Sequence, residues 1–186
     1  RMHKLIMLSS TWQMSSRATQ EGLARDPGNS LFWRFNMRRL SSEEVRDSVL
    51  AATGELNLTQ GGPSIYVPIP QAVLAGQSRP GAGWGKSSPK EAARRSVYIH
   101  VKRSLLVPVL EMHDQAPTDA SCPVRYVTTV PTQSLVMLNG EFMNRKARAL
   151  ADRITQEFPD DAAEQIRRAI RLTTGRRTGD NEVARD

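Results

Sequence analysis

The chain has 186 residues and a formal net charge of +7, and 39% of its residues are hydrophobic. This length suffices for one domain with long excursions, and a core can form although some of the chain should lie outside it. The positive charge favours acidic partners such as nucleic acid, an anionic glycan or an acidic protein surface. The basic residues form separate doublets with acids nearby, however, so the pattern argues against specific nucleic-acid binding.

The chain contains a single cysteine, Cys122. One thiol cannot form an internal disulfide, and it excludes a Cys-x-x-Cys metal site or haem-attachment motif within these residues. The longest apolar run, residues 105–110, is too short to cross a bilayer, so we expect no membrane span. The sequence begins at Arg1, and it shows no charged segment followed by an apolar stretch of the kind that marks a signal peptide.

The first forty residues predict one helix and one turn. Residues 3–14 place Leu5, Leu8 and Trp12 at spacings of three and four, which is typical of a helical face. Three hydroxyl residues within this stretch weaken the pattern because their side chains compete for backbone hydrogen bonds. Residues 25–29 have the composition of a turn.

A capped helix is predicted to follow residue 41. Ser41 and Glu44 have the spacing of a capping box, in which each side chain binds the free amide of the other residue. Val45 and Leu50 supply part of an apolar face. Gly54 is placed to end the helix, because glycine tolerates the left-handed conformation that this position requires.

Residues 61–88 are rich in glycine and proline and contain no acidic residue, which predicts a long flexible surface loop. A second capping box, formed by Ser88 and Glu91 with Pro89 at the first helical position, predicts a short helix after the loop. Apolar and polar residues alternate over 97–101, and this period of two predicts a short strand.

The last third of the chain predicts helices. Residues 131 to about 158 form the longest predicted helix, with an inner apolar stripe that reaches Ile154. Two acids at 160–161 begin a further helix, which Gly175 ends. We therefore predict a mainly α fold: a helical bundle-like single domain over residues 1–186, with a short strand element and long irregular loops.

No catalytic or metal-binding constellation stands out. Residues 81–87 have the composition of a phosphate-binding loop, but the spacing to Gly-Lys-Ser does not fit one. His113 could transfer protons or bind a metal, although a polar helix end is the simpler interpretation. Cys122 could be a nucleophile only if a histidine approached it. Trp84 could stack on a sugar or base ring. We assign no catalytic residue, no cofactor-binding residue and no metal ligand from these patterns.

Basic residues gather around the predicted strand and form the densest polar group in the sequence. Guanidinium groups of this kind could clamp a carboxylate, sulfate or phosphate of a ligand. They could equally pair internally with Asp114, Glu111 or Asp47. The residues of this candidate anion or ligand site are Arg94, Arg95, Arg103, Asp114, Arg125 and Gln133.

A series of short motifs runs along nearly the whole chain in a distinctive order. The motifs are HKLI at 3–6, SSTWQMSS at 9–16, DPGN at 26–29, LFWR at 31–34, RRL at 38–40, EVRDS at 44–48, GGPS at 61–64, RRSVY at 94–98, KRS at 102–104, SC at 121–122, VTTVPTQ at 127–133 and LN at 138–139. Their order and spacing resemble the planctomycete C-terminal domain of unknown function. That domain accompanies haem-c-type cytochrome domains in large exported bacterial proteins.

The resemblance implies the kind of protein to which the chain belongs, but no particular reaction. It implies that this chain is the C-terminal part of a larger, multidomain, envelope-associated protein, periplasmic or secreted. Covalent haem c would be bound upstream of this chain and not by it. The resemblance carries over no known catalytic residue. The function we expect is therefore a non-catalytic accessory or interaction domain whose partners are the upstream domains. The alternative is part of an enzyme or a binding site for an acidic or sulfated polysaccharide, and whether the chain belongs to an enzyme stays open.

Overall fold

The computed structural model describes residues 1–184. Within these residues the regular structure is helical, and extended segments pair only through isolated β-bridges, without a sheet. The prediction of a mainly α fold with irregular loops is confirmed. The chain forms two compact units, Arg1–Arg39 and Leu40–Asp186, which we describe separately. The single domain over residues 1–186 stays a prediction, and the last two residues of that span lie outside the described residues.

The N-terminal unit begins with a helix that is shorter than predicted. Helix α1 spans Met2–Met7, whereas the pattern indicated a helix to residue 14. The hydroxyl of Ser9 donates to the carbonyl of Ile6 at 2.7 Å and accepts from the amide of Trp12 at 3.2 Å. The hydroxyl therefore takes partners that a continuing helix would use, and turns replace the second half of the predicted helix.

A second short helix and a tight turn complete this unit. Helix α2 spans Gln20–Arg25. The carboxylate of Asp26 accepts two backbone amides at 2.7–3.0 Å, and its carbonyl accepts the indole N–H of Trp33 at 2.9 Å. The turn predicted at 25–29 is therefore confirmed. The Trp33 ring lies so close to Gly22 that a Cβ at that glycine would come within 2.5 Å of the ring.

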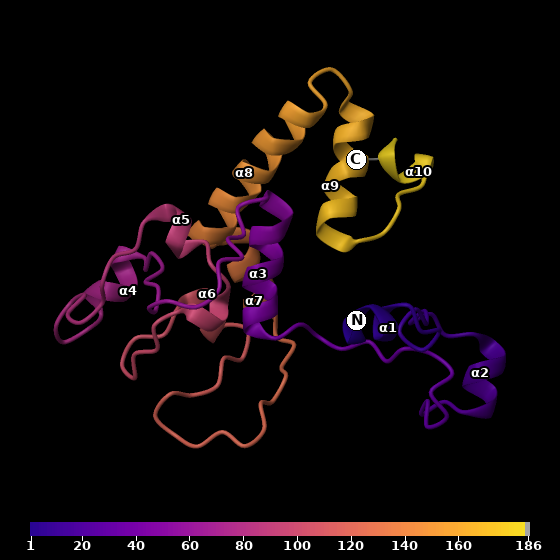
Figure 1. Cartoon of the computed structure of the whole chain (residues 1–186), viewed down its shortest axis with the longest axis horizontal. Helices are drawn as coiled ribbons and strands as arrows, with labels where there is room; N and C mark the ends of the chain where they lie inside the picture. The colour runs from indigo at the N-terminus through magenta and orange to yellow at the C-terminus, as the bar shows by residue number, and fades with distance from the viewer. Residues whose placement is uncertain (185–186) are drawn as a thin grey trace. The chain divides into compact units, whose positions relative to one another are not determined.

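Helix α3, Ser42–Thr53, lies at the centre of the C-terminal unit (Figure 1). Its predicted capping box is present: the side chain of Ser41 accepts the amide of Glu44 at 3.4 Å, and Glu44 accepts the amide of Ser41 at 2.8 Å. Gly54 ends the helix in the left-handed conformation, with φ of 79°. Four other helices, α6, η1, α8 and α9, pack against α3, which leaves Leu50 only 1% exposed.

The Gly/Pro-rich stretch over 61–88 contributes to the core as well as to the surface. Ile65 and Val67 are buried, and the short helix α4, Gln71–Ala75, lies within the stretch. Ile65 forms a parallel bridge with Ile99, because its amide donates to Tyr98 and its carbonyl accepts from His100, both at 2.8 Å. The flexibility of this stretch stays a prediction.

The segment after it begins as predicted but contains no strand. Helix α5, Pro89–Ala92, carries the predicted capping box between Ser88 and Glu91. The expected strand over 97–101 is instead the 3₁₀ helix η1, Ser96–Tyr98, followed by the single bridge at Ile99. Of the three alternating apolar residues only Ile99 is buried, since no second strand lies beside the others.

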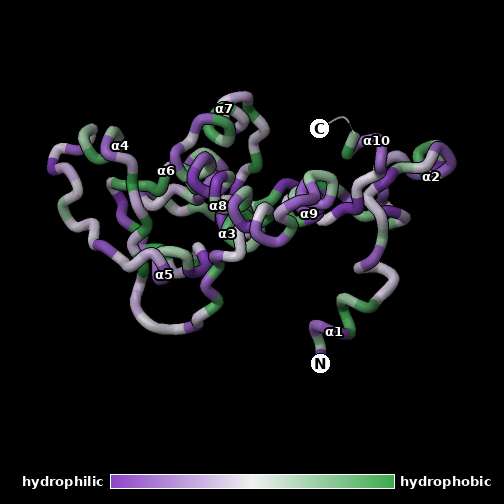
Figure 2. The backbone as a smooth tube through the Cα atoms, turned by 90° about the horizontal axis from the view of Figure 1, so that it is seen from above, coloured by the Kyte–Doolittle hydropathy of each residue, from purple (hydrophilic) through white to green (hydrophobic). Residues whose placement is uncertain are grey.

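The main hydrophobic cluster joins the 65–67 segment to the chain around α6. Helix α6 spans Pro108–Glu111 and begins at its proline, where the missing amide costs nothing. The clustered side chains are those of Ile65, Val67, Ile99, Val107, Val109 and Leu110. Figure 2 shows hydrophobic backbone, in green, at α6. Side chains of this cluster and of α3 line part of the pocket described below.

The long helix predicted from 131 to about 158 is two helices. Helix α7 spans Pro131–Asn139 and helix α8 spans Glu141–Glu157. Gly140 between them is extended, with φ of −68° and ψ of 131°. A Cβ at this glycine would lie 2.5 Å from the carbonyl oxygen of Val136, so a side chain does not fit the break.

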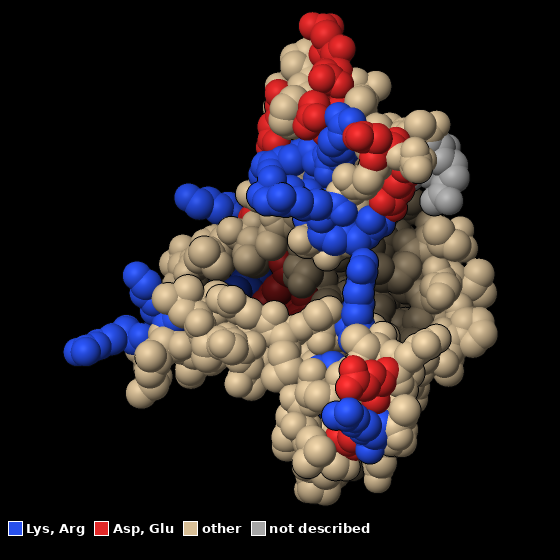
Figure 3. All heavy atoms as spheres, turned by 90° about the vertical axis from the view of Figure 1, so that its right-hand side faces the viewer, with Lys and Arg blue, Asp and Glu red and all other residues tan. Residues whose placement is uncertain are grey.

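Helices α8 and α9 form an antiparallel hairpin (Figure 1), and α10, Asp180–Val183, follows it. Helix α9 spans Ala162–Thr174; its predicted start at Asp161 and its end at Gly175 are both confirmed. Glu157 pairs with Arg153 at 2.8 Å and with Arg168 at 2.7 Å, which ties the two helices together. Acidic and basic side chains meet at this end of the hairpin in Figure 3. Among residues 1–184, no helix combines the length and the apolar character needed to span a membrane.

Candidate functional site

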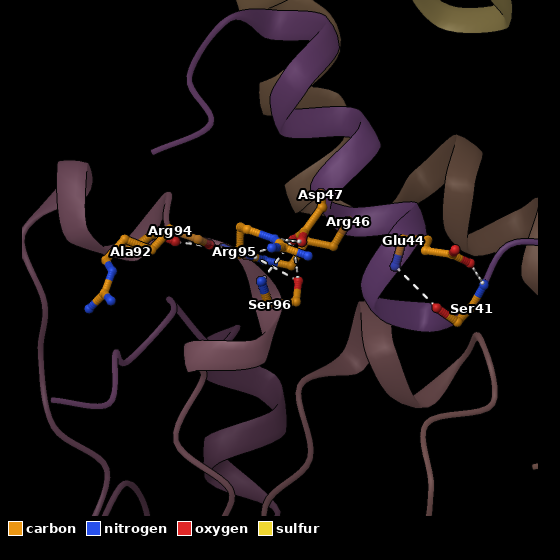
Figure 4. A network of polar contacts seen from close by, with 8 residues as sticks. All are labelled: Ser41, Glu44, Arg46, Asp47, Ala92, Arg94, Arg95 and Ser96. Atoms are coloured by element: carbon orange, nitrogen blue, oxygen red, sulfur yellow. Dashed lines mark hydrogen bonds and ion pairs between the residues drawn. The ribbon is translucent and has the colours of Figure 1, made fainter. Parts of the chain in front are cut away.

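A buried arginine connects helix α3 to the segment that follows α5. Arg46 is only 2% exposed, and Figure 4 shows its side chain reaching from α3 toward residues 92–96. Its guanidinium donates to the carbonyls of Ala92 at 2.5 Å and Arg94 at 3.0 Å, and to the hydroxyl of Ser96 at 3.1 Å. Ala92 ends α5, Arg94 follows it and Ser96 begins the 3₁₀ helix η1, so Arg46 supplies donors to oxygens at the junction between these two short helices.

Asp47 provides the charge that balances Arg46. Its carboxylate lies 3.6 Å from the Arg46 guanidinium and accepts the amide and hydroxyl of Ser96 at 2.8 and 2.7 Å. Burial lowers the pKa of Arg46 to about 10, and the neighbouring carboxylate opposes this shift. Arg46 therefore stays charged at neutral pH and acts as a structural cation, with both terminal nitrogens of its guanidinium donating hydrogen bonds.

A pocket of about 260 Å³ opens beside this network. Its walls come from α3, the segment at 67–70, α5, α6 and the junction between α7 and α8. The walls are mostly apolar; Leu50, Val67, Val109 and Phe142 are among the side chains that line it. A few hundred cubic ångströms bounded by apolar side chains is the usual form of a small-molecule site.

The polar groups of this pocket are paired with one another. Lys146 donates to both carboxylate oxygens of Glu55 at 2.8 Å, and Arg145 donates to Glu141 at 3.0 Å. Burial opposes ionisation of Glu55, but hydrogen bonds from Lys146 and Thr53 outweigh it and hold the pKa of Glu55 below its ordinary value. The lining therefore contains two acid–base pairs, and its further cation, Arg46, lies beside Asp47.

Over residues 1–185 the chain matches the family described as PSD1, a protein of unknown function (DUF1553). It belongs to the DUF1553 family. No curated protein and no solved structure matches the chain. The membership confirms a domain of unknown function, while the planctomycete origin and the association with cytochrome domains stay predictions.

The six residues predicted to form an anion site occupy different surroundings in this DUF1553 structure. Arg94 is 5% exposed and donates to the carbonyls of Thr59, Gly61 and Pro63, with its guanidinium 3.9 Å from the centre of the Tyr98 ring. Gly61 and Gly62 have φ of 75° and 80°, a conformation that lets this loop fold around the guanidinium. Arg94 therefore holds the start of the 61–88 stretch in place.

Two further predicted arginines pair with acids on helix α3. Arg95 lies 3.7 Å from Asp47, and Arg125 donates to Glu43 at 2.8 Å. Glu43 and Asp47 are one turn apart, so α3 brings Arg95 and Arg125 to one side of the helix. The internal pairing of Arg95 with Asp47 is one of the alternatives that the sequence left open. Arg103 is exposed and has no side-chain hydrogen bond or ion pair within residues 1–184.

Asp114 and Gln133 come together through Thr128. Asp114 adopts φ of 61° and accepts the amide and hydroxyl of Thr128 at 2.9 and 2.8 Å. Gln133 donates to the same hydroxyl at 3.2 Å and accepts the amide of Val130 at 3.3 Å. This trio closes the long loop between α6 and α7, so its contacts account for two polar residues that the sequence placed in a ligand site.

The remaining sequence candidates have structural partners. His113 is buried, with Nδ1 2.8 Å from the carbonyl of Val109. Trp84 is half-buried, donates to the carbonyl of Val67 at 3.0 Å and packs edge-on against Tyr66. The thiol of Cys122 lies 3.4 Å from the carbonyl of Val124. Over residues 1–184 no group of three or more His, Cys, Asp or Glu side chains is arranged to hold a metal ion.

Sequence reasoning did not find Arg46 or the pocket. One signal was present: Arg46 lies four residues before Leu50 and seven before Thr53, so it shares the buried face of α3. The pocket gave no such signal, because its walls come from segments that are far apart in the sequence.

Proposed function

We propose that this DUF1553 chain is a non-catalytic accessory or interaction domain of a multidomain, exported bacterial protein that carries haem c. The family membership and the motif series that resembles the planctomycete C-terminal domain support this context. Its partners are the upstream domains of the same protein. Its location is the periplasm, the cell envelope or the extracellular space.

The observation that carries the proposal is the apolar surface of the N-terminal unit. Within residues 1–39 the one buried residue of those described is polar, Asn29. The large hydrophobic side chains of the unit are exposed instead, and they include Met2, Leu5, Met7, Leu8, Trp12, Leu31, Phe32 and Met37. Figure 2 shows hydrophobic backbone at both α1 and α2.

Exposure of this extent is unfavourable unless something covers it. Burying one such side chain fully is worth roughly 1.5–3 kcal/mol, so several together are a strong driving force for association. Large exposed apolar patches on folded proteins mark interaction sites. A unit held by polar contacts around Asp26 and Asn29, with its apolar side chains outward, suits docking onto a neighbouring domain.

Covalent haem belongs to the upstream part of the protein in this proposal. Attachment of haem c uses a Cys-x-x-Cys-His motif, and Cys122 is the single cysteine of this chain. The residues described here therefore do not fit a haem-attachment site. Their contribution is a surface that binds the domain carrying the haem.

Two measurements on the native full-length protein test the proposal. A reduced, alkaline pyridine spectrum with intact mass should show covalent haem. Cross-linking through amines should join Lys4, the one lysine of the N-terminal unit, to upstream domains, whereas Lys90 in the second unit serves as the reference. Absence of haem, or a Lys4 that links to nothing upstream while Lys90 reacts normally, would contradict it.

A second candidate, a binding site for an acidic or sulfated polysaccharide, is favoured by one polar pocket. This pocket of about 490 Å³ is lined by Arg79, Lys102, Ser78 and Ser104. Cationic and hydroxyl side chains of this kind bind sulfate and carboxylate groups. Titration with a sulfated glycan and its desulfated form at two salt concentrations tests it, since charge-driven binding should weaken as salt rises. Equal binding of both forms, or none at low salt, would exclude it.

A further inference from the structure

The apolar pocket of the C-terminal unit has no role in the proposed docking function. It lies entirely within residues 46–146, and none of its lining residues belongs to the N-terminal unit. Its volume of about 260 Å³ exceeds the roughly 150 Å³ of an engineered apolar cavity that binds benzene. The pocket can therefore hold a molecule of one to two rings.

Prolines keep several of the walls in position. Pro68 and Pro70 flank Ile69 on one side, Pro89 begins α5 and Pro108 begins α6. Proline fixes one backbone dihedral, so these walls lose little entropy when a ligand orders them. The hydrogen bonds from Arg46 to three oxygens likewise fix the position of the adjoining segment at 92–96.

The charges around the pocket argue for an uncharged ligand. Lys146 is 19% exposed and bound to both oxygens of Glu55, and Arg145 is bound to Glu141. Arg46, the remaining cation in the lining, is already committed to backbone oxygens and Ser96. An anionic ligand would have to compete with Glu55 for Lys146 or with Glu141 for Arg145, whereas an uncharged one leaves both pairs undisturbed.

We propose that this pocket binds a small, uncharged hydrophobic molecule of one or two rings. Such a ligand gains the burial of its apolar surface against Leu50, Val67 and Val109. The paired charges stay solvated beside it and exclude charged analogues.

A matched pair of probes tests the charge preference on the full chain. 2-Naphthol and naphthalene-2-sulfonate share an apolar body and differ in charge. Methyl-group NMR titration should show 2-naphthol shifting the methyl signals of Leu50, Val67 and Val109. The sulfonate should bind at least about tenfold more weakly, because its charge must be desolvated without a free cation nearby. Comparable affinity of the two probes, or no shift of these methyls, would overturn the proposal.

A filling substitution tests the location. Met143 lines the pocket from α8, so Met143→Trp should occupy its volume and weaken 2-naphthol binding at least about tenfold. Met137→Trp is the matched control, because Met137 lies on α7, is 36% exposed and is not part of the lining. Unchanged binding in Met143→Trp would place the probe elsewhere, for example on the exposed apolar side chains of residues 1–39, and would overturn the proposal. The methyl shifts of the unsubstituted chain decide the question even if that variant fails to fold.

Discussion

Arg46 is a buried side chain that binds oxygens of three residues at the junction between α5 and η1, so the stability of the protein should be sensitive to its substitution. Its guanidinium donates hydrogen bonds to the carbonyls of Ala92 and Arg94 and to the hydroxyl of Ser96. Replacing one member of a buried charged network leaves the other members desolvated and unpaired. The network therefore contributes by satisfying oxygens that would otherwise be buried alone, more than by the attraction between Arg46 and Asp47.

Arg46→Met should destabilise the protein by about 3–5 kcal/mol, since it leaves two carbonyls and the Ser96 hydroxyl without their buried donor and removes a cation beside Asp47. Arg145→Met is the control, because Arg145 makes an exposed pair one helical turn from Glu141 and its loss should cost less than about 0.5 kcal/mol. Urea denaturation monitored by circular dichroism measures both. Equal unfolding midpoints for the two variants would contradict the structural role of Arg46.

The pair of Glu43 with Arg125 predicts a pH dependence of stability. The hydrogen bond from Arg125 outweighs burial and holds the pKa of Glu43 below its ordinary value of 4.5. A carboxyl with a lowered pKa in the folded state stabilises the protein above its unfolded pKa, and this stability disappears as pH falls through the folded pKa. Glu43→Gln should therefore be less stable than the unsubstituted chain at pH 7.

The difference in unfolding free energy between Glu43→Gln and the unsubstituted chain should shrink as pH falls below about 4.5. It should become small once Glu43 is protonated. Glu21→Gln controls for charge alone, because Glu21 and its partner Arg25 are 75% and 79% exposed. Urea midpoints across the acid range provide the measurement. A difference between Glu43→Gln and the unsubstituted chain that stays constant from pH 7 to pH 3 would show that the pair does not act through the charge of Glu43.

At the scale of elements, the helix ends follow from local residues while the connections depend on tertiary packing. The capping boxes at Ser41 and Ser88 and the end at Gly175 were predicted because each depends on residues within one turn. The break at Gly140 was not, because a single glycine inside a helical pattern is usually tolerated. The predicted apolar stripe begins at Met143, after the break. The alternation over 97–101 suggested a strand, but a strand needs a neighbour, and only one bridge forms.

The break between α7 and α8 gives a test at this scale. Gly140→Ala should destabilise the protein by roughly 1–3 kcal/mol, because the added Cβ would lie 2.5 Å from the carbonyl oxygen of Val136. Gly179→Ala is the matched control: nothing lies within 4 Å of a Cβ placed there. Thermal or urea unfolding compares the two. A Gly140→Ala variant as stable as Gly179→Ala would mean that the two helices fuse without strain.

In the candidate site too, residues chosen from local sequence patterns have partners that the sequence could not predict, because those partners lie far away along the chain. The sequence singled out arginines by their density, and the structure gives Arg94, Arg95 and Arg125 internal partners 31 to 82 residues away. Gln133 and Asp114 both bind Thr128, a contact that depends on the fold of the loop and not on a local sequence pattern. The apolar pocket needs Val67, Ala93, Val109 and Phe142 in one place, and no periodicity within a single segment reports that.

At the scale of the whole molecule, the two units differ in how they are stabilised. The C-terminal unit has a buried apolar cluster around Ile65, Val107 and Leu110. The described residues of the N-terminal unit have none, and polar contacts of Asp26 and Asn29 hold its turns while its apolar side chains face outward. This contrast is the physical basis for assigning docking to residues 1–39 and small-molecule binding to the C-terminal unit.

Hydroxyl-radical footprinting of the native full-length protein tests the docking function most directly. Met2, Met7, Trp12 and Met37 are readily oxidised side chains that are 55–83% exposed in this chain, and Tyr126 in the other unit is 83% exposed. We predict that these four react much more slowly in the full-length protein than in the isolated chain, because an upstream domain covers them, while Tyr126 reacts alike in both. Equal oxidation of the four residues in both proteins would contradict the role of this surface in docking.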